Sequence, residues 1–258
     1  METSLVAPVA ALFGLAFGSF INVVAHRVPL EKSVTSPASA CPACGAPIRQ
    51  RDNVPVLSWL LLRGRCRDCG ARISARYPLV EAGTAGLFAA TVLVIGVGPE
   101  LPAYLWFVAV GLTLALTDID VHRLPNRILY PSTVVGATLL LIAAVVDGDL
   151  GMFARAVGGG AFYFVLFLIL ALVARGGFGF GDVKLAFFLG LFLAYDTWDV
   201  LGAGIALGIA IGGLWAIGLL ITRNADRKAK IPFGPAMILG AYAALVVGQE
   251  LVDWYLGS

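Results

Sequence analysis

Apolar runs of membrane-spanning length fill most of this sequence and restrict the folds that it can adopt. A helix needs about 17–25 predominantly apolar residues to cross a bilayer. Only 13% of the residues are charged, against roughly 25% in soluble domains. We therefore predict an all-α polytopic membrane protein with about eight transmembrane helices. The runs cover residues 5–25, 79–98, 101–117, 128–146, 152–174, 183–195, 198–221 and 233–256, and the sixth is short for a span.

The placement of basic residues predicts how the chain is oriented in the membrane. Nine Lys or Arg residues lie in 26–78 and four more in 222–230. The connections 96–100 and 147–151 and the tail after 249 contain Asp or Glu but no Lys or Arg. Since basic loops stay in the cytoplasm, both termini are predicted outside. Four connections then face the cytoplasm: 26–78, 118–127, 175–182 and 222–230.

Three segments follow from this topology. Residues 1–25 are predicted to form the first transmembrane helix, and no basic segment precedes it as in a cleavable signal peptide. Residues 26–78 form a cytoplasmic loop, and residues 79–258 form the membrane-embedded core. The partner that composition indicates is the lipid bilayer, and no nucleic-acid partner is predicted.

The cytoplasmic loop contains all four cysteines, in two CxxC pairs that are each followed by glycine. Two such pairs typically supply four thiolates to one tetrahedral Zn²⁺, although the 21 residues between them slightly exceed the usual spacing. Disulfides are disfavoured in the cytoplasm, and a redox motif needs no second pair. A four-thiolate site has no open position, so the zinc is predicted to be structural. Its ligands are Cys41, Cys44, Cys66 and Cys69.

Two aspartates stand at the ends of apolar segments, where an ionisable group is costly and usually functional. Asp118 follows the run 101–117, and Asp182 follows the glycine-rich stretch 176–181. The predicted topology places both at the cytoplasmic face. Two adjacent carboxylates can share a proton, so that one acts as a base on water while the other polarises a carbonyl. The pair therefore indicates acid–base hydrolysis.

Other readings of these residues remain open. Asp118 could simply end a helix, and Asp182 could be an N-cap. Asp120 is the rival of Asp118, although residues two apart on a helix face different directions. Lys184 either modulates the charge of Asp182 or extends to the membrane surface. Metal and serine hydrolysis are less favoured, because neither HExxH nor GxSxG occurs.

Several ordered motifs in this chain resemble those of the bacterial type 4 prepilin peptidases, which are bifunctional leader peptidases and N-methyltransferases of the GxGD aspartic class. The resemblance covers nearly the whole chain, including the tetracysteine loop. Its motifs are GSFINVV at 18–24 with HRVP at 26–29, DNVPVLSWL at 52–60, RYPLVE at 76–81, DIDVHRLP at 118–125, GFGDVKL at 179–185 and IPFGP at 231–235.

This resemblance implies an aspartic endopeptidase of the cell inner membrane, with Asp118 and Asp182 as its catalytic residues. Its implied substrates are prepilins and pseudopilins, whose short basic leader ends in glycine just before an apolar helix. A second implied activity methylates the new N-terminal residue with S-adenosylmethionine. Many relatives read LPD where this chain reads Leu-Pro-Asn at 124–126. The oligomeric state is left open.

The binding residues for S-adenosylmethionine are not readable from the sequence. Gly18 and Asn22 are the candidates, but Gly18 could equally be a small packing residue and Asn22 an interhelical hydrogen-bonding residue. Two other functional classes remain as alternatives. A multi-pass transporter with an aspartate proton relay predicts acids at the bilayer midplane and paired repeats. A structural assembly subunit would use the zinc loop for docking.

Overall fold

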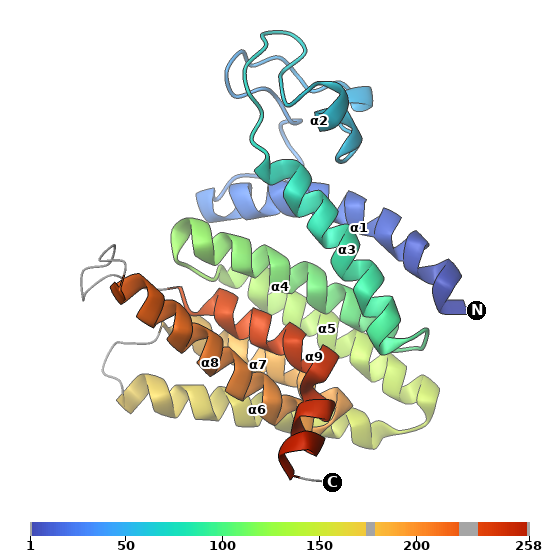
Figure 1. Cartoon of the computed structure of the whole chain (residues 1–258), viewed down its shortest axis with the longest axis vertical. Helices are drawn as coiled ribbons and strands as arrows, with labels where there is room; N and C mark the ends of the chain where they lie inside the picture. Colours follow the sequence, from blue (N-terminus) through green and yellow to red (C-terminus); the bar gives the residue numbers. More distant parts are fainter. Residues whose placement is uncertain (1, 174–178, 222–231, 257–258) are drawn as a thin grey trace. The chain divides into compact units, whose positions relative to one another are not determined.

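The described part of the chain contains eight long helices, as the apolar runs predict. The computed structural model describes residues 2–173, 179–221 and 232–256, and within them no β-strand occurs. The short α2 (Leu57–Leu61) and two 3-10 turns, η1 (Val28–Leu30) and η2 (Gln50–Asp52), lie in the cysteine loop. The long helices are α1 (Glu2–Arg27), α3 (Arg76–Ile95), α4 (Leu101–Val121), α5 (Asn126–Asp147), α6 (Leu150–Val173), α7 (Phe180–Asp196), α8 (Trp198–Ile221) and α9 (Gly234–Leu256) (Figure 1).

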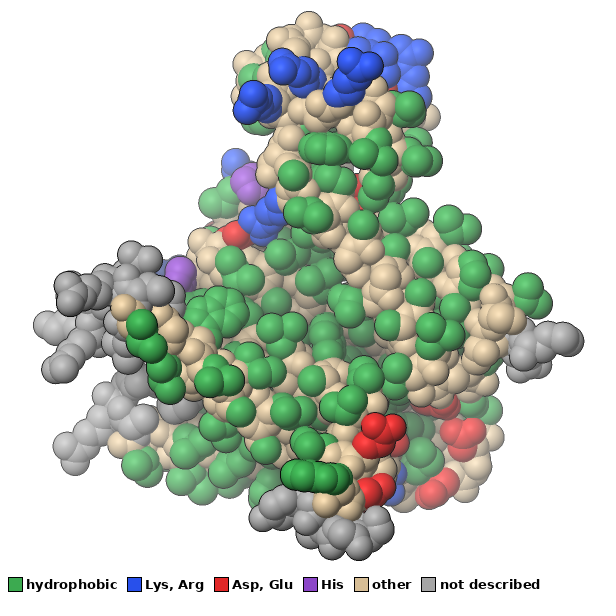
Figure 2. All heavy atoms as spheres, viewed as in Figure 1, with side chains coloured by type: hydrophobic (Ala, Val, Ile, Leu, Met, Phe, Trp, Pro, Cys, Tyr) green, Lys and Arg blue, Asp and Glu red, His purple; other side chains and the backbone are tan. Residues whose placement is uncertain are grey.

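Seven of these helices are long and apolar enough to cross a membrane. The chain is therefore a multi-pass membrane protein, and hydrophobic side chains cover much of the helix surface (Figure 2). The remaining long helix is α7, with 17 residues, which is the run that the sequence marks as short. Helix α4 continues to Val121, four residues beyond the predicted run, and it ends where His122 adopts a left-handed conformation (φ 52°, ψ 41°).

The chain divides into two compact units, Met1–Val97 and Gly98–Ser258. In the first unit, α1 and α3 pack closely because glycines of α1 face the backbone of α3. A Cβ added to Gly14 would lie 2.7 Å from the Cα of Ala85, and one added to Gly18 would lie 2.6 Å from the Cα of Glu81. Small residues at such crossings are typical of helix pairs in membranes. The cysteine loop connects the ends of this pair.

In the second unit, α7 is the central helix. It packs against α5, α6, α8 and α9, and 12 of its 17 residues are buried. Phe107 of α4 lies with its ring centroid 4.7 Å from that of Phe192 and 5.7 Å from that of Phe188, both on α7. Neighbouring helices therefore shield the short α7.

Glycines also set the closest approaches in the second unit. A Cβ on Gly190 of α7 would lie 2.7 Å from the carbonyl oxygen of Gly159 on α6, and one on Gly240 of α9 would overlap the backbone of Gly208 on α8. At the end of α7, the guanidinium of Arg155 donates hydrogen bonds of 2.6–2.8 Å to the carbonyl oxygens of residues 194–196. These contacts fix the position of α7, which begins two residues before Asp182.

Candidate active site and metal site

Asp182 lies in the first turn of α7, where the local sequence fixes its carboxylate. Gly179 is the N-cap in an extended conformation (φ −76°, ψ 141°). The Oδ2 atom of Asp182 accepts a hydrogen bond of 3.2 Å from the Gly179 N–H, and the Asp182 N–H donates one of 3.0 Å to the Gly179 carbonyl. Asp182 is therefore not the N-cap itself. An acid in the first turn is also favoured by the helix dipole. The stretch 174–178 lies outside the described residues.

Asp118 lies inside the last turns of α4 rather than at its end. Its side chain is buried, with 5% of its surface exposed. Its Oδ2 atom has no hydrogen-bond partner of standard geometry among the described residues, and it lies against Gly234, the first residue of α9, where an added Cβ would be 2.8 Å from that oxygen. The Gly234 backbone interacts with this carboxylate, and a buried acceptor with no well-formed hydrogen bond is costly in a protein interior.

Leu124 connects the surroundings of the two aspartates. A Cβ on Gly181 would lie 3.3 Å from the Cβ of Leu124, and one on Gly234 would lie 3.6 Å from its Cδ2. The side chain therefore packs between the first turns of α7 and α9. Asp182 is also buried and lies within electrostatic range of Asp118. The end of α4 and the first turns of α7 and α9 thus place the two predicted carboxylates around the same leucine side chain.

The segment before α9 explains how Gly234 reaches Asp118. The ring of Phe233 occupies the space that a side chain on Gly212 of α8 would need, and its centroid lies 6.1 Å from that of Phe167 on α6. Pro235 follows in the first turn, where its missing N–H costs no intrahelical hydrogen bond. The sequence alone assigns no role to this motif. Phe233 anchors the segment, and Gly234 leaves room for the carboxylate.

Two further residues lie in the same motifs as the pair: Asp120, the rival of Asp118, and Lys184. Asp120 is exposed and Asp118 is buried, although both lie in the last turns of α4. Lys184 Nζ donates a hydrogen bond of 3.0 Å to Asn126 Oδ1 and lies 4.9 Å from the centroid of the Phe180 ring. Lys184 thus links α7 to the start of α5.

In the first unit, the four cysteines form a compact cluster. Their Sγ atoms all lie within 4.8 Å of one another, and those of Cys41 and Cys69 are 3.8 Å apart. A tetrahedral ion with bonds of about 2.3 Å to sulfur separates its ligands by about 3.8 Å, so the cluster fits zinc. All four are free thiols, which excludes the disulfide reading for this conformation.

Each CxxC pair adopts the same turn. Gly45 donates a hydrogen bond to the Cys41 carbonyl and has φ 72°, and Gly70 repeats this with the Cys66 carbonyl at φ 74°. Glycine accepts this left-handed conformation without strain. Hydrogen bonds from the backbone N–H groups of Cys44 and Ala43 lower the pKa of the Cys41 thiol to about 7. The turn of the first pair therefore favours the thiolate of Cys41, the form that binds metal.

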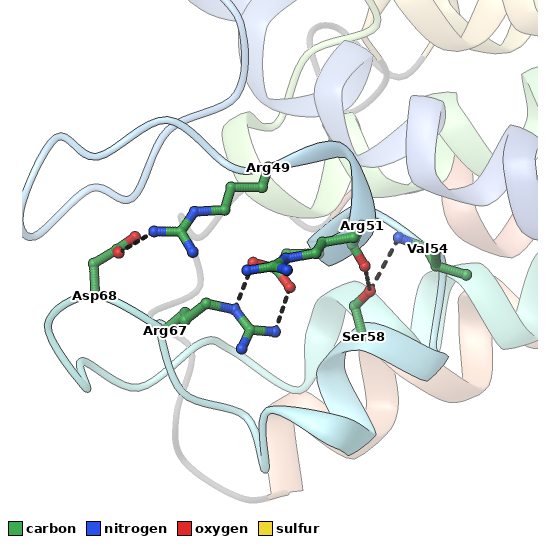
Figure 3. Close-up of polar contacts among 7 residues, drawn as sticks. Arg49, Arg51, Val54, Ser58, Arg67 and Asp68 are labelled. Atoms are coloured by element: carbon green, nitrogen blue, oxygen red, sulfur yellow. Dashed lines mark hydrogen bonds and ion pairs between the residues drawn. The ribbon is translucent and has the colours of Figure 1, made fainter.

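Ion pairs cross the loop beside the cluster (Figure 3). Arg67 forms two hydrogen bonds of 2.6 and 2.8 Å with the carboxylate of Asp52, and this guanidinium lowers the pKa of Asp52. Arg49 Nη2 lies 2.9 Å from Asp68 Oδ1. Basic side chains gather on the surface of this loop (Figure 2). The second basic segment, 222–230, lies outside the described residues.

The candidate cofactor residues Gly18 and Asn22 both face α3 within the first unit. Asn22 Nδ2 donates hydrogen bonds to the carbonyl oxygens of Gly18 (3.2 Å) and Tyr77 (3.3 Å). Gly18 packs on the backbone of Glu81. Gly18 therefore makes a packing contact, and Asn22 makes a hydrogen bond between the two helices, as their structural interpretations predict.

In comparisons with known proteins, each of the two units contains one family-model match. Residues 12–95 match the bacterial Peptidase A24 N-terminal domain, and residues 105–224 match the type IV leader peptidase family. The prepilin leader peptidase/N-methyltransferase of Aeromonas hydrophila is 36% identical over 95% of this chain and 92% of its own. The proteins of the same name from Bacillus subtilis and Pseudomonas aeruginosa are each 32% identical over 95% of this chain, covering 96% and 91% of theirs. No solved structure matches the chain. This protein is a member of the type IV leader peptidase family.

Proposed function

We propose that the protein is a membrane-embedded aspartic endopeptidase that removes the leader peptide from prepilins and pseudopilins and then N-methylates the new N-terminus. The observation that carries the peptidase assignment is that Asp118 and Asp182 are both buried in the second unit, within electrostatic range of each other. Family membership and the names of the relatives support the same reaction and add the methylation.

The geometry suggests a division of work between the two carboxylates. Two adjacent carboxyl groups hold one proton between them, because two neighbouring negative charges in a buried site repel. The Gly179 N–H orients Asp182, whereas the Oδ2 atom of Asp118 is left as an acceptor for a water molecule. The ionised partner removes a proton from that water as it attacks the scissile carbonyl. The protonated partner donates a hydrogen bond to the carbonyl oxygen.

The topology supports a cytoplasmic active site in the inner membrane. Basic residues concentrate in the cysteine loop and in 222–230, whereas 96–100 and 147–151 are acidic. By the positive-inside rule, both termini then lie outside and the aspartate pair faces the cytoplasm. A basic leader is held on that same side, so its junction with the apolar helix of the substrate would meet the pair at the membrane surface.

The two cofactors of the proposal have different roles. Zinc would be held by Cys41, Cys44, Cys66 and Cys69 and would cross-link a loop that is too small for a core of its own. S-adenosylmethionine would supply the methyl group, and Gly18 and Asn22 remain candidates for its site.

The test is cleavage of a prepilin by the purified full chain in detergent or nanodiscs. Asp118→Asn and Asp182→Asn keep the shape of each side chain and remove its charge, and each should lower kcat by at least about 10³-fold if the two act as one unit. Asp120→Asn is the matched control, because it makes the same change in an exposed side chain one half-turn from Asp118. Efficient cleavage by either of the first two variants would contradict the assignment.

A further inference from the structure

A polar junction in the first unit is not used by the proposed hydrolysis. We define it by Asn22 of α1, Glu81 of α3 and Val56 of the cysteine loop. Asn22 is a candidate for the S-adenosylmethionine site, whereas Glu81 and Val56 have no role in the proposed chemistry so far. Glu81 is buried, with 8% of its surface exposed, and Asn22 is equally buried. An acidic side chain inside a helix of spanning length is costly and marks a functional site by default.

Glu81 differs from the other acids that the structure describes in this unit. Asp52 and Asp68 are each paired with an arginine, Arg67 and Arg49 respectively. Glu31 is exposed. Glu81 has no ion pair within the described residues, and its one hydrogen bond in the junction comes from the N–H of Val56, 2.7 Å from Oε2. An ionised carboxylate has about four acceptor positions, so most of its capacity to bind a cation remains.

The backbone on the loop side of Glu81 is strained. Val56 has φ 60° and ψ −52°, and the Leu57 N–H donates to the Pro55 carbonyl at 2.6 Å. This is a classic γ-turn, which is rare for any residue and worse for a β-branched one. Such strain persists only where the surroundings enforce it, and it is concentrated at functional sites. Here the turn directs the Val56 N–H at the carboxylate.

Neighbouring contacts hold both sides of the junction rigid. Ser58 Oγ accepts a hydrogen bond of 3.1 Å from the Val54 N–H and donates one of 3.2 Å to the Arg51 carbonyl, which fixes the turn (Figure 3). On the helix side, the absence of a side chain at Gly18 lets α1 lie against the backbone of Glu81. The Asn22 amide donates one hydrogen bond within α1, to the Gly18 carbonyl, and one to the Tyr77 carbonyl of α3. The turn at Val56 and the packing of α1 on α3 therefore hold the Glu81 carboxylate in a fixed position.

We propose that Glu81 binds the free N-terminal amino group of the cleaved substrate and accepts its proton for methyl transfer. This inference rests on the proposed N-methyltransferase activity. Once the leader is removed, the new N-terminus is an ammonium group with an ordinary pKa of about 7.7–8.0. Its lone pair is therefore unavailable at neutral pH. Glu81 is a buried carboxylate with no arginine or lysine partner among the described residues, so it can bind that cation.

The reaction balances with the methyl donor already proposed. The ammonium transfers one proton to the Glu81 carboxylate, and the resulting amine attacks the methyl carbon of the sulfonium. The C–S bond breaks, its electron pair stays on sulfur as a neutral thioether, and the nitrogen becomes a methylated ammonium. The Glu81 proton is then released to water. No oxidant or further reactant is required.

The key variant is Glu81→Gln in the full chain. Glutamine keeps an oxygen that can accept the hydrogen bond from the Val56 N–H. Its side chain has no charge and cannot take up a proton. Methyl transfer from S-adenosylmethionine to a synthetic peptide with a free mature N-terminus should fall by about 10²-fold. The KM for that peptide should rise and the KM for S-adenosylmethionine should stay unchanged. Leader cleavage and zinc content should match the wild type. Glu31→Gln is the control, since it removes the same charge from an exposed position.

Each outcome decides the proposal. A specific loss of methyl transfer that shrinks as the pH rises above about 8, where bulk solvent deprotonates the amine, supports it. Wild-type methylation by Glu81→Gln overturns it. Equal loss of cleavage, zinc and methylation also overturns it, because the residue would then only hold the loop. If the wild type itself methylates no free N-terminus, the methyltransferase assignment fails first, while cleavage by the aspartate pair stands.

Discussion

The contact between Gly234 and Asp118 predicts that one added methyl group impairs catalysis without unfolding the protein. A Cβ at position 234 would lie 2.8 Å from Asp118 Oδ2, about 0.6 Å short of the 3.4 Å at which ordinary contact begins. The atom that must yield is the end of a side chain and not backbone. Gly234→Ala should therefore displace the carboxylate at a small cost in stability.

The size of the effect follows from the precision that catalysis needs. A catalytic group must be held within about 0.5 Å of its productive position, and a misplacement of about 1 Å can cost 10²-fold in rate. We expect Gly234→Ala to lower kcat by about 10- to 100-fold, or about 1.4–2.7 kcal/mol of transition-state stabilisation. The KM for the prepilin should change little, because the leader-binding contacts are untouched.

The assay is steady-state cleavage of a prepilin, together with thermal unfolding in the same detergent. Gly248→Ala is the matched control on α9, since its Cβ would meet only ordinary contacts at 3.4 Å or more. Gly181→Ala, with Leu124 at 3.3 Å, should have an intermediate effect. Wild-type kcat for Gly234→Ala would refute the reasoning. So would a fall in kcat that merely follows a fall in Tm.

Two other predictions concern stability and metal binding. Gly190→Ala places a Cβ 2.7 Å from the Gly159 carbonyl oxygen, and since backbone cannot move aside, the free energy of unfolding should fall by about 1–3 kcal/mol. Gly213→Ala, with open space around it, should leave it unchanged or raise it by up to about 1 kcal/mol, and equal stability of the two variants would contradict the packing argument. Cys41→Ser and Cys66→Ser each remove one thiolate from the cluster and should abolish stoichiometric zinc in elemental analysis. An undiminished metal content would exclude the four-thiolate site.

Features that depend on nearby residues were predictable from the sequence. The long helices match the apolar runs because, in lipid, backbone polar groups must bond within their own segment. The cysteine cluster was predictable because each CxxC and its glycine form one local turn. The helix ends were less well predicted. Asp118 lies inside α4 and not beyond it, because a helix can continue past the last apolar residue when its polar side chain faces protein.

The surroundings of the two aspartates were not predictable, because they depend on helices far apart in the chain. The sequence names Asp118 and Asp120 as rivals two positions apart, and only packing buries the first and exposes the second. Leu124 and Gly234 lie in family-like motifs, but the sequence alone does not place either of them near an aspartate. Their contacts with Gly181 and Asp118 exist only because α7 and α9 begin beside the end of α4.

The sequence by itself determined that this chain spans the membrane, carries four thiols in one loop at metal-ligand spacing and carries two costly aspartates. These conclusions rest on hydrophobicity, charge and spacing, which are local quantities. The tertiary structure decided which carboxylates are buried, that α7 is enclosed by other helices, and that Glu81 faces a strained turn at Val56. Each of these is a contact between distant segments, and the energy of such contacts comes from side-chain packing that no single stretch of sequence encodes.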